Sequence, residues 1–324
     1  MDTRVGTDVS FCADLLQAGK LVAVPTETVY GLASNALNEA AVLKIFEAKN
    51  RPSFNPLIVH IAGLQEASKY AASVPDAAQR LAEAFWPGPL TLLLPKTTAV
   101  PDLVTAGSAL VALRVPRHPL LQSLLSKLDF PLAAPSANPS GYVSPTTATH
   151  VQQQLSGHIP YILDGGPCEV GLESSIIGFD GEDAILHREG GIAAEALEAA
   201  LGMPLRKATA ADRATTTPGS LKSHYATSTP LYLGDLPSLL TQFSHERCAV
   251  ISFSKEYPQA SRSFVLSPEG KLEEAARRLF AILREADAAG CTVILAEPAP
   301  EEGLGRAIND RLRRAQHLLK NPHP

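Results

Sequence analysis

The sequence of 324 residues shows no cysteine pair, no secretory-signal pattern and no run long and apolar enough to cross a bilayer. Its 4 cysteines are scattered, at Cys12, Cys168, Cys248 and Cys291. Without a Cys-x-x-Cys pair, this spacing indicates neither a disulfide framework nor a structural zinc site. We therefore expect a protein of the reducing cytoplasm.

An excess of positive charge is also lacking, because the net charge is −5. Broad, sequence-independent binding to nucleic acid needs many uncompensated cations, so only a local basic pocket is compatible with this charge. Hydrophobic residues make up 45% of the chain and charged residues 19%, which is typical of a soluble globular enzyme. The length exceeds the usual size of one core and predicts one large or two medium domains.

The common nucleotide-binding and hydrolytic motifs are missing as well. The nearest approach to a phosphate-binding P-loop, Gly166–Gly171, continues with Leu-Glu and places no lysine on a γ-phosphate. The sequence has no dinucleotide-binding fingerprint, no Ser-His-Asp order and no His-Glu-x-x-His. A nucleotide would therefore be held by side chains and helix N-termini, in a site that works by positioning and electrostatics.

What the chain does contain, over its first two-thirds, is an alternation of apolar and amphipathic segments. The predicted strands are Leu21–Val24, Leu57–Ile61, Leu90–Leu94, Leu110–Val115, Tyr161–Leu163 and Ser175–Phe179. The predicted helices are Glu39–Ala48, Leu64–Ala72, Ala77–Phe85, Pro119–Leu128 and Ala193–Leu201. This order predicts an α/β domain in which some strands pair antiparallel.

A boundary follows near residue 206, where periodicity is lost until the turn signal Pro218-Gly219. We predict an α/β domain over 8–205, a linker over 206–229 and a smaller βαβ-type domain over 230–324. Its predicted elements are strands Leu231–Leu233, Ala249–Phe253 and Thr292–Ala296, and helices Leu272–Ala288 and Leu304–Leu318.

Lys49 and Arg51 are the first candidates for phosphate binding. They stand at the predicted end of a helix, just before Pro52. An extended exit segment would let both side chains reach one ligand, with Arg as a planar fork and Lys as a mobile point charge. The alternative is that the two cations only neutralise the C-terminus of the helix.

Three further polar residues stand at or near predicted strand ends. Ser136 and Asn138 follow the strand-like Pro131–Ala134, at an edge where ligands bind in α/β sheets, or they cap their own turn. Arg114 lies within an apolar strand and needs an anion, either a ligand carboxylate or phosphate, or a structural Asp or Glu.

Other polar residues allow two interpretations. His60, in a strand, is either a structural residue or part of a site. The cluster of Thr26, Glu27, Thr28 and Tyr30 either recognises a small polar ligand or forms a hydrogen-bonded turn. Asp164 more simply stabilises a turn than contacts magnesium.

The order of the motifs is more specific than any one of them. The series is Pro25–Leu32, Lys49–Leu57, Trp86–Thr91, Arg114–Pro116, Pro135–Asn138, Ser144–Thr146, Asp164–Pro167, Glu173–Ser175 and Arg188–Gly190. Over about residues 8 to 205 it resembles the catalytic domain of the threonylcarbamoyl-AMP synthase family. Pro218–Ala226 resembles the linker of the two-domain form, and Gly303–Leu312 resembles its C-terminal domain. The resemblance implies a twisted mixed sheet of the YrdC-like type followed by a smaller βαβ (Rossmann-like) domain.

The resemblance also implies an activity, the joining of L-threonine, bicarbonate and ATP into threonylcarbamoyl-AMP with release of pyrophosphate. Mg²⁺ would be carried by ATP. The product would serve a separate transferase that forms N6-threonylcarbamoyladenosine in tRNA. Stable nucleic-acid binding or a membrane is not required.

By motif position, the resemblance implies an ATP site with Lys49 and Arg51 as its catalytic cations. It would consist of Lys49, Arg51, Asn55, Leu110, Ser136, Asn138, Ser144, Arg188, His224 and Tyr225. The implied threonine site consists of Thr28, His60, Arg114, Ala134 and Ser174. Ser223 departs from the family, which often has a basic residue just before His-Tyr, although Lys222 could substitute.

Three alternatives compete with this interpretation. A carbamoyl-transferring YrdC-like protein of the hydrogenase-maturation type would need zinc-finger cysteines and greater length. A double-stranded RNA-binding module would need more cations than the net charge allows. A sugar-phosphate lyase of related fold would need clustered acids around magnesium, which the sequence does not show.

Overall fold

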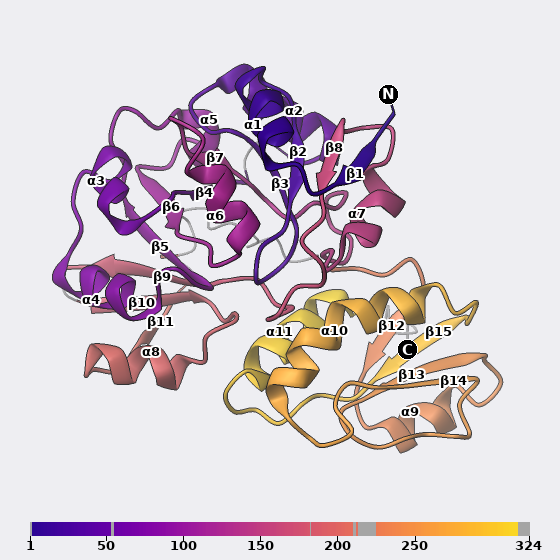
Figure 1. The fold of residues 1–324 in the computed structure, drawn as a ribbon. Helices are drawn as coiled ribbons and strands as arrows, with labels where there is room; N and C mark the ends of the chain where they lie inside the picture. The colour runs from indigo at the N-terminus through magenta and orange to yellow at the C-terminus, as the bar shows by residue number, and fades with distance from the viewer. Residues whose placement is uncertain (1, 53–54, 182, 210–211, 213–224, 317–324) are drawn as a thin grey trace. The chain divides into compact units, whose positions relative to one another are not determined.

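The computed structural model describes residues 2–52, 55–181, 183–209, 212 and 225–316 (Figure 1). The chain forms two compact units, each described here by itself. The first consists of Met1–Ser140 and Ser144–Ser220, and the second of Gly141–Val143 and Leu221–Pro324. The division expected from the sequence, at 205/206 and 229/230, stays a prediction. The assignment of Gly141–Val143 to the second unit could not be anticipated from a linear reading.

The first unit contains an 11-stranded mixed sheet in the order β1-β8-β2-β3-β7-β4-β6-β5-β9-β10-β11. The strands are β1 (Arg4–Gly6), β2 (Val22–Val24), β3 (Gly31–Asn35), β4 (Ile58–His60), β5 (Leu90–Pro95), β6 (Leu110–Arg114), β7 (Leu132–Ala133), β8 (Tyr161–Leu163), β9 (Ser175–Asp180), β10 (Asp183–Arg188) and β11 (Arg206–Lys207). β4 and β6 pair parallel, whereas β5–β6 and β9–β10 pair antiparallel. The mixed pairing confirms the predicted fold class.

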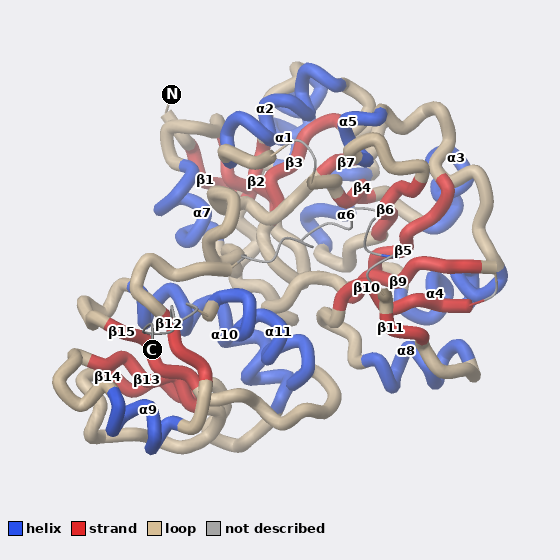
Figure 2. The backbone as a smooth tube through the Cα atoms, turned by 180° about the vertical axis from the view of Figure 1, so that it is seen from behind, coloured by secondary structure: helices blue, strands red, loops and turns tan. Residues whose placement is uncertain are grey.

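Helices pack on both faces of this sheet, as the view from behind also shows (Figure 2). They are α1 (Val9–Gln17), α2 (Glu39–Lys49), α3 (Ala67–Tyr70), α4 (Asp76–Phe85), α5 (Asp102–Thr105), α6 (Pro119–Leu125), α7 (Ala148–Leu155) and α8 (Ala194–Leu201), with a 3₁₀ turn η1 at Leu64–Glu66. Helices α1 and α6 share one buried apolar cluster. Helices α2, α4, α7 and α8 contribute to a second, larger one. The strands β2 and β3 are therefore buried between helices on both sides, typical of an α/β domain.

The second unit is a parallel four-stranded sheet in the order β12-β15-β13-β14. Its elements are β12 (Leu231–Leu233), α9 (Leu236–Gln242), β13 (Cys248–Ser252), β14 (Arg262–Val265), α10 (Leu272–Asp287), β15 (Val293–Ala296) and α11 (Gly305–Ala315). One apolar face of α10 is formed by Ala275, Ala276, Leu279, Phe280 and Leu283, all fully buried. The predicted βαβ-type arrangement is confirmed.

The strands and long helices predicted in both units are present with small shifts at their ends. The helix predicted over Leu64–Ala72 is instead η1 followed by the short α3, and the helix predicted over Pro119–Leu128 ends at Leu125. The elements not predicted are β1, α1, β3, α5, α7, β10, β11, α9 and β14. Several of these lack a strong local signal. β3, for example, reads Gly-Leu-Ala-Ser-Asn, which is rich in turn-forming residues.

Within the described residues, none of the helices has the length and apolar character needed to cross a membrane.

Candidate functional site

A tight loop follows β7 and carries the predicted residues Ser136 and Asn138. An isolated bridge pairs Ser136 with Gly31, and the N–H of Ala137 donates to the carbonyl of Tyr30 at 2.8 Å. A Cβ on Gly31 would lie 3.2 Å from the Cβ of Ala134, so the two segments pack closely at this glycine. The loop is thereby fixed against the motif that precedes β3.

Lys49 anchors the same loop from the end of α2. Its Nζ donates to the carbonyls of Ser136 and Asn138, and its own carbonyl accepts from the N–H of Ser140 at 2.8 Å. The structure thus brings together Lys49, Ser136 and Asn138, three residues of the implied ATP site. A role in contacting ATP stays a prediction.

Arg51 is turned back against its own segment by the way α2 ends. Asn50 takes a left-handed conformation with φ 48°, and the N–H of Arg51 donates to the carbonyl of Phe46. The guanidinium then donates from Nε to the carbonyl of Asn55 at 3.3 Å and from Nη2 to that of Pro56 at 3.0 Å. Arg51 is therefore turned toward Asn55 and Pro56 of its own segment, and the left-handed Asn50 departs from the extended exit expected before Pro52.

Lys49 and Arg51 are both buried, with 1% and 9% of their surface exposed. Burial, together with the neighbouring charge of Arg51, lowers the pKa of Lys49 well below its usual value. Burial lowers the pKa of Arg51 to about 10. Among the described residues their hydrogen bonds go to main-chain carbonyls, and neither cation contacts a carboxylate. Two buried cations without an anion form a site suited to a polyanionic ligand.

Arg114 and His60 are brought side by side by the parallel pairing of β6 and β4. Nη2 of Arg114 lies 2.8 Å from Oε1 of Glu27, and both residues are buried. Burial favours the neutral form of Glu27, but Arg114 and two main-chain hydrogen bonds outweigh it and keep the carboxyl pKa below its usual value. The sequence left two possible partners for Arg114, an anion of the ligand or a structural carboxylate. The structural carboxylate is present.

The pKa of His60 is lowered to about 3, first because the imidazole is buried and second because Arg114 is close. His60 is therefore neutral at physiological pH. Its Nδ1 has no hydrogen-bond partner within the part of the chain that the structure describes. A neutral imidazole with an unused nitrogen beside a guanidinium can recognise a hydroxyl or an amine of a small ligand.

Arg188 and Ser174 form a second polar group at the start of β9. Arg188 donates from Nε to the carbonyl of Ser174 at 3.0 Å, and from Nη2 to its Oγ at 3.1 Å. The Oγ of Ser174 also lies 2.7 Å from Oγ1 of Thr91. A Cβ on Gly190 would lie 2.4 Å from the main chain of Ser174, so this approach requires glycine.

The remaining predicted residues have defined places. The Oγ of Ser144 donates to Oε1 of Glu173 at 2.7 Å. Thr28 is buried in a turn closed by Thr26, whose Oγ1 lies 2.7 Å from that of Thr28. Leu110 opens β6, and the N–H of Ala134 donates to the carbonyl of Ile58 at 3.0 Å.

Hydrogen bonds connect these groups into one region of the first unit. Gly88 accepts from Nε of Arg114 and donates to Val115, and Pro89 accepts from Ser175 beside Ser174. The hydrogen bond from the N–H of Ala134 to the carbonyl of Ile58 joins β4 to the loop that carries Ser136. Main-chain segments far apart in sequence thus place the predicted residues around Arg114 and Lys49 in one neighbourhood.

Two carboxylates also lie in this neighbourhood: Glu27, which the sequence placed only in a ligand-binding or turn-forming cluster, and Glu173, which received no role from the sequence. Glu27 pairs with Arg114, and Glu173 accepts from Ser144. Each is buried and adjoins residues of a quoted motif. The sequence signal that could have identified them is an acidic residue beside a motif. Such a residue, once buried, needs a charged or hydrogen-bonding partner in the site.

The structure describes the predicted linker residues only in part. Lys222, Ser223 and His224 lie outside the described residues. Tyr225 is buried in the second unit, where its ring stacks on Phe280 with 5.3 Å between ring centroids. The guanidinium of Arg311 lies 5.7 Å from the centre of the Tyr225 ring. Contact of His224 or Tyr225 with ATP stays a prediction.

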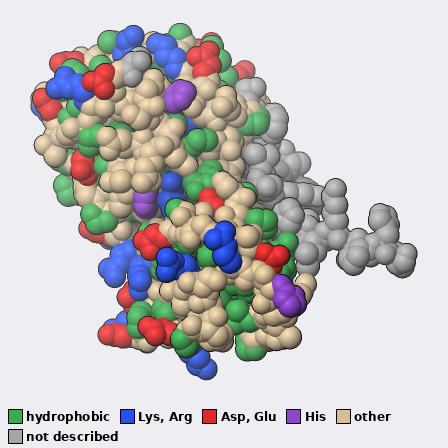
Figure 3. Space-filling view, turned by 90° about the vertical axis from the view of Figure 1, so that its right-hand side faces the viewer, with side chains coloured by type: hydrophobic (Ala, Val, Ile, Leu, Met, Phe, Trp, Pro, Cys, Tyr) green, Lys and Arg blue, Asp and Glu red, His purple; other side chains and the backbone are tan. Residues whose placement is uncertain are grey.

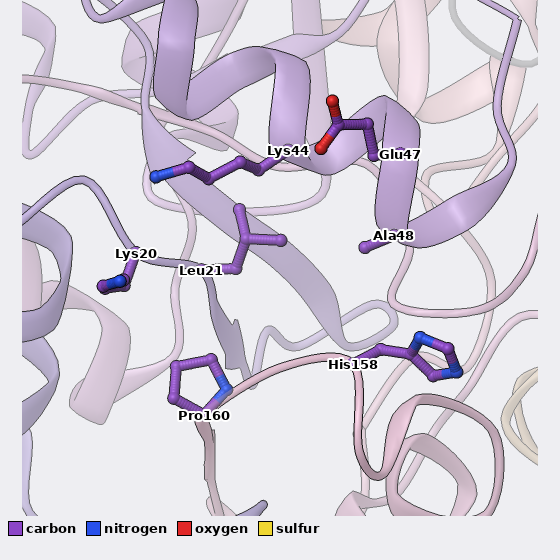
Figure 4. A pocket seen from close by; sticks show the side chains of 7 residues that line it. All are labelled: Lys20, Leu21, Lys44, Glu47, Ala48, His158 and Pro160. Carbon is purple, nitrogen blue, oxygen red and sulfur yellow. The ribbon is translucent and has the colours of Figure 1, made fainter. Parts of the chain in front are cut away.

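A separate pocket of 370 Å³ lies between α2 and the segments before β2 and β8 (Figure 4). It is lined by Lys20, Leu21, Lys44, Glu47, Ala48, His158 and Pro160. The predicted site residues are not part of this lining. Lys44 is engaged there, since its Nζ donates to the carbonyl of Gly19 at 2.7 Å.

On the face shown in Figure 3, basic, acidic and apolar side chains are interspersed. The visible part of this face offers no broad cationic area of the kind that a nucleic-acid backbone needs.

Comparison with known protein families gives a match to each of the two parts of the chain. A family model described as "Telomere recombination", covering Sua5, YciO and YrdC, matches residues 14–190. A second model, the C-terminal domain of threonylcarbamoyl-AMP synthase, matches residues 192–316. The two matches together span both compact units.

Individual relatives agree with the models. The threonylcarbamoyl-AMP synthase of Pyrococcus abyssi is 42% identical over 320 residues, covering 95% of this chain and 93% of the relative. That of Bacillus subtilis is 40% identical, covering 95% and 92%. The crystal structure of P. abyssi Sua5 complexed with L-threonine matches with a TM-score of 0.90 at 40% identity, over 97% of each chain. The chain is therefore a member of the threonylcarbamoyl-AMP synthase family and an enzyme.

Proposed function

We propose that this enzyme joins L-threonine, bicarbonate and ATP into threonylcarbamoyl-AMP and pyrophosphate. The observation that carries the proposal is the pair of buried cations Lys49 and Arg51, which have no carboxylate partner among the described residues. A triphosphate would provide the anionic charge that this part of the fold lacks. The relatives' name and the threonine in the matched crystal structure support the identity of the substrates.

The reaction would proceed in two steps. The amine of threonine adds carbon dioxide, supplied by bicarbonate, and loses a proton to give a carbamate. A carbamate oxygen then attacks the α-phosphorus of ATP, and the bond from that phosphorus to the bridging oxygen of pyrophosphate breaks. The second step needs alignment and neutralisation of the departing charge more than proton transfer. Lys49 and Arg51 would provide that neutralisation.

Threonine would be held by the polar group around Arg114. Nη2 of this arginine is paired with Glu27 and Nε with Gly88, while Nη1 has no hydrogen-bond partner within the described residues and would meet the threonine carboxylate. Neutral His60 and Thr28 would face the amine and hydroxyl. A methyl pocket would discriminate threonine from serine by only about 10–200-fold, whereas valine would leave the hydroxyl's partners unpaired and be rejected more strongly.

Magnesium would arrive with ATP. Among the described residues, no group of three or more His, Cys, Asp and Glu side chains could hold a metal ion. This donor set fits an ion held mainly by phosphates, which would supply charge neutralisation at the phosphoryl groups. Asp164 is engaged in its turn, since its Oδ1 accepts from the N–H of Gly166 at 2.9 Å.

We further propose a cytoplasmic enzyme whose product passes to a separate tRNA-modifying transferase. Family similarity over both units favours this over the carbamoyl-transferring and RNA-binding alternatives.

The test is mass spectrometry of the products formed from ATP, magnesium, L-threonine and labelled bicarbonate, together with a pyrophosphate assay. We expect labelled threonylcarbamoyl adenylate, and about 10²–10³-fold less of it per unit time with Arg51→Ala, comparable to the loss of one charge-stabilising donor. Lys20→Ala, a cation of the separate pocket, serves as the control. Pyrophosphate release that is independent of threonine and bicarbonate would contradict the proposal.

A further inference from the structure

The tripeptide Gly141–Val143 lies between two predicted nucleotide-binding residues, Asn138 and Ser144, yet it packs within the second unit. The hydroxyl of Tyr142 donates to Oδ2 of Asp287 at 2.7 Å. Nη2 of Arg284 donates to the carbonyl of Val143, and its guanidinium lies 5.1 Å from the centre of the Tyr142 ring. The tripeptide is therefore held at two successive residues by the last turn of α10.

Asp287 also binds the end of the linker. Besides Tyr142, it accepts from the N–H of Ser228 at 3.1 Å and from that of Thr229 at 2.7 Å. A further bond joins the N–H of Ala226 to the carbonyl of Gly141 at 2.8 Å. One carboxylate thus connects the tripeptide to the segment that leaves the linker.

The position of Asp287 is unfavourable for a helix taken alone, because a negative charge at a helix C-terminus opposes the macrodipole. Burial also favours its neutral form, yet the donors from Thr229, Tyr142 and Ser228 keep the pKa of the carboxyl below its usual value. Burial and the bond to Asp287 raise the pKa of Tyr142 to about 12, so its hydroxyl remains a donor. The carboxylate is stabilised by the contacts that it makes to the tripeptide and the linker.

We propose that Asp287, Arg284 and Tyr142 are positioning residues that fix the nucleotide-binding loop through contacts made within the second unit. Lys49 holds the first half of that loop through the carbonyls of Ser136 and Asn138. The last turn of α10 holds the second half, immediately before Ser144. The proposal rests on the function proposed above, in which this loop contacts ATP.

The first test compares Asp287→Asn with Glu285→Gln, an exposed carboxylate of the same helix. An asparagine keeps one acceptor oxygen but turns its NH2 group toward the donors on the other side, so the tripeptide and the linker can no longer both be held by the same side chain without an N–H facing a donor. In the full-length chain we expect the KM for ATP to rise about tenfold, the effect of losing one charge-assisted hydrogen bond. We expect kcat and the KM for threonine to change less than about twofold.

A second variant guards against misfolding. Tyr142→Phe removes only the hydroxyl and keeps the ring under Arg284, so it should raise the KM for ATP by about three- to tenfold. Combined with Asp287→Asn, it should add little, because both changes remove the same bond. Lower kcat with unchanged KM for ATP, or Asp287→Asn behaving like Glu285→Gln, would overturn the proposal.

Calorimetric titration with ATP and magnesium separates this inference from the proposed reaction. If wild-type protein forms no threonylcarbamoyl-AMP but binds ATP, weaker binding by Asp287→Asn than by Glu285→Gln still supports the positioning role. If wild-type protein forms the product and both variants bind ATP equally, the reaction stands and the positioning role is rejected.

Discussion

Two places in the first unit bury positively charged side chains, and they differ in whether a carboxylate of the described residues neutralises the charge. Arg114 lies 2.8 Å from the carboxylate of Glu27, with both side chains almost fully buried. Lys49 and Arg51 are as deeply placed, but they donate to main-chain carbonyls and contact no carboxylate among the described residues. The first site is electrically complete without a ligand, whereas the second is not.

The difference assigns distinct tasks to the two sites. A neutralised pair can orient a small zwitterion such as threonine without attracting every anion. An uncompensated pair of buried cations is costly for the protein alone and is relieved by a polyanion. Under the proposed function, the fold would therefore separate the recognition of the amino acid from the capture of phosphate.

The largest expected effect is on stability at the neutralised site. Arg114→Met should reduce the free energy of unfolding by about 3–5 kcal/mol, because it leaves Glu27 as an unpaired buried carboxylate. Arg51→Met removes a cation that has no carboxylate partner, and should cost only about 1–2 kcal/mol for two hydrogen bonds to carbonyls. Urea unfolding of both variants measures the difference. Equal losses would mean that the two sites do not differ as described. The double variant Glu27→Gln/Arg114→Met should recover part of the loss.

The next effect is stabilisation by an anion. Inorganic pyrophosphate at about 100 times its Kd should stabilise the wild-type protein by about 2.7 kcal/mol, seen as a rise in Tm. Arg51→Met should lose most of that rise, because the cation that meets the anion is gone. Lys20→Met, in the separate pocket, should keep it. If Arg51→Met kept the rise in Tm and Lys20→Met lost it, the anion would bind at the separate pocket. The assignment of the anion site to Lys49 and Arg51 would then be rejected.

The smallest effect is the dependence of stability on pH. Because the pKa of His60 falls from 6.5 to about 3 on folding, the unfolded chain binds a proton below pH 6.5 that the folded chain does not. Stability is therefore complete above pH 6.5 and decreases by about 1.4 kcal/mol per pH unit as the pH falls toward 3. Between pH 7 and 5, His60→Gln should flatten this slope in urea unfolding. The Glu27 carboxyl, with its lowered pKa, affects stability only below that range.

The sequence predicted the regular elements best where the burial pattern is strong, continuous in Leu90–Leu94 and helically periodic in α10. It did not predict β3 or β1, because their few residues carry little pattern and each pairs with a strand far along the chain, β1 with β8 and β3 with β7. In the site, motif order brought Lys49 and Ser136 together. It could not show that Arg114 already has a carboxylate partner or that Arg51 folds back on its own loop. Those features depend on tertiary packing and on the left-handed turn at Asn50.

The assignment of Gly141–Val143 to the second unit also bears on the order in which the protein can mature during synthesis. Domains generally fold as they emerge, N-terminal first. Strands up to β11 can pair before the second unit has been made. The loop around Tyr142 cannot, since its partners Ala226, Arg284 and Asp287 are translated much later. A nascent chain released before α10 would therefore carry the sheet of the enzyme without the partners of Tyr142, so the loop proposed to contact ATP would still be incomplete.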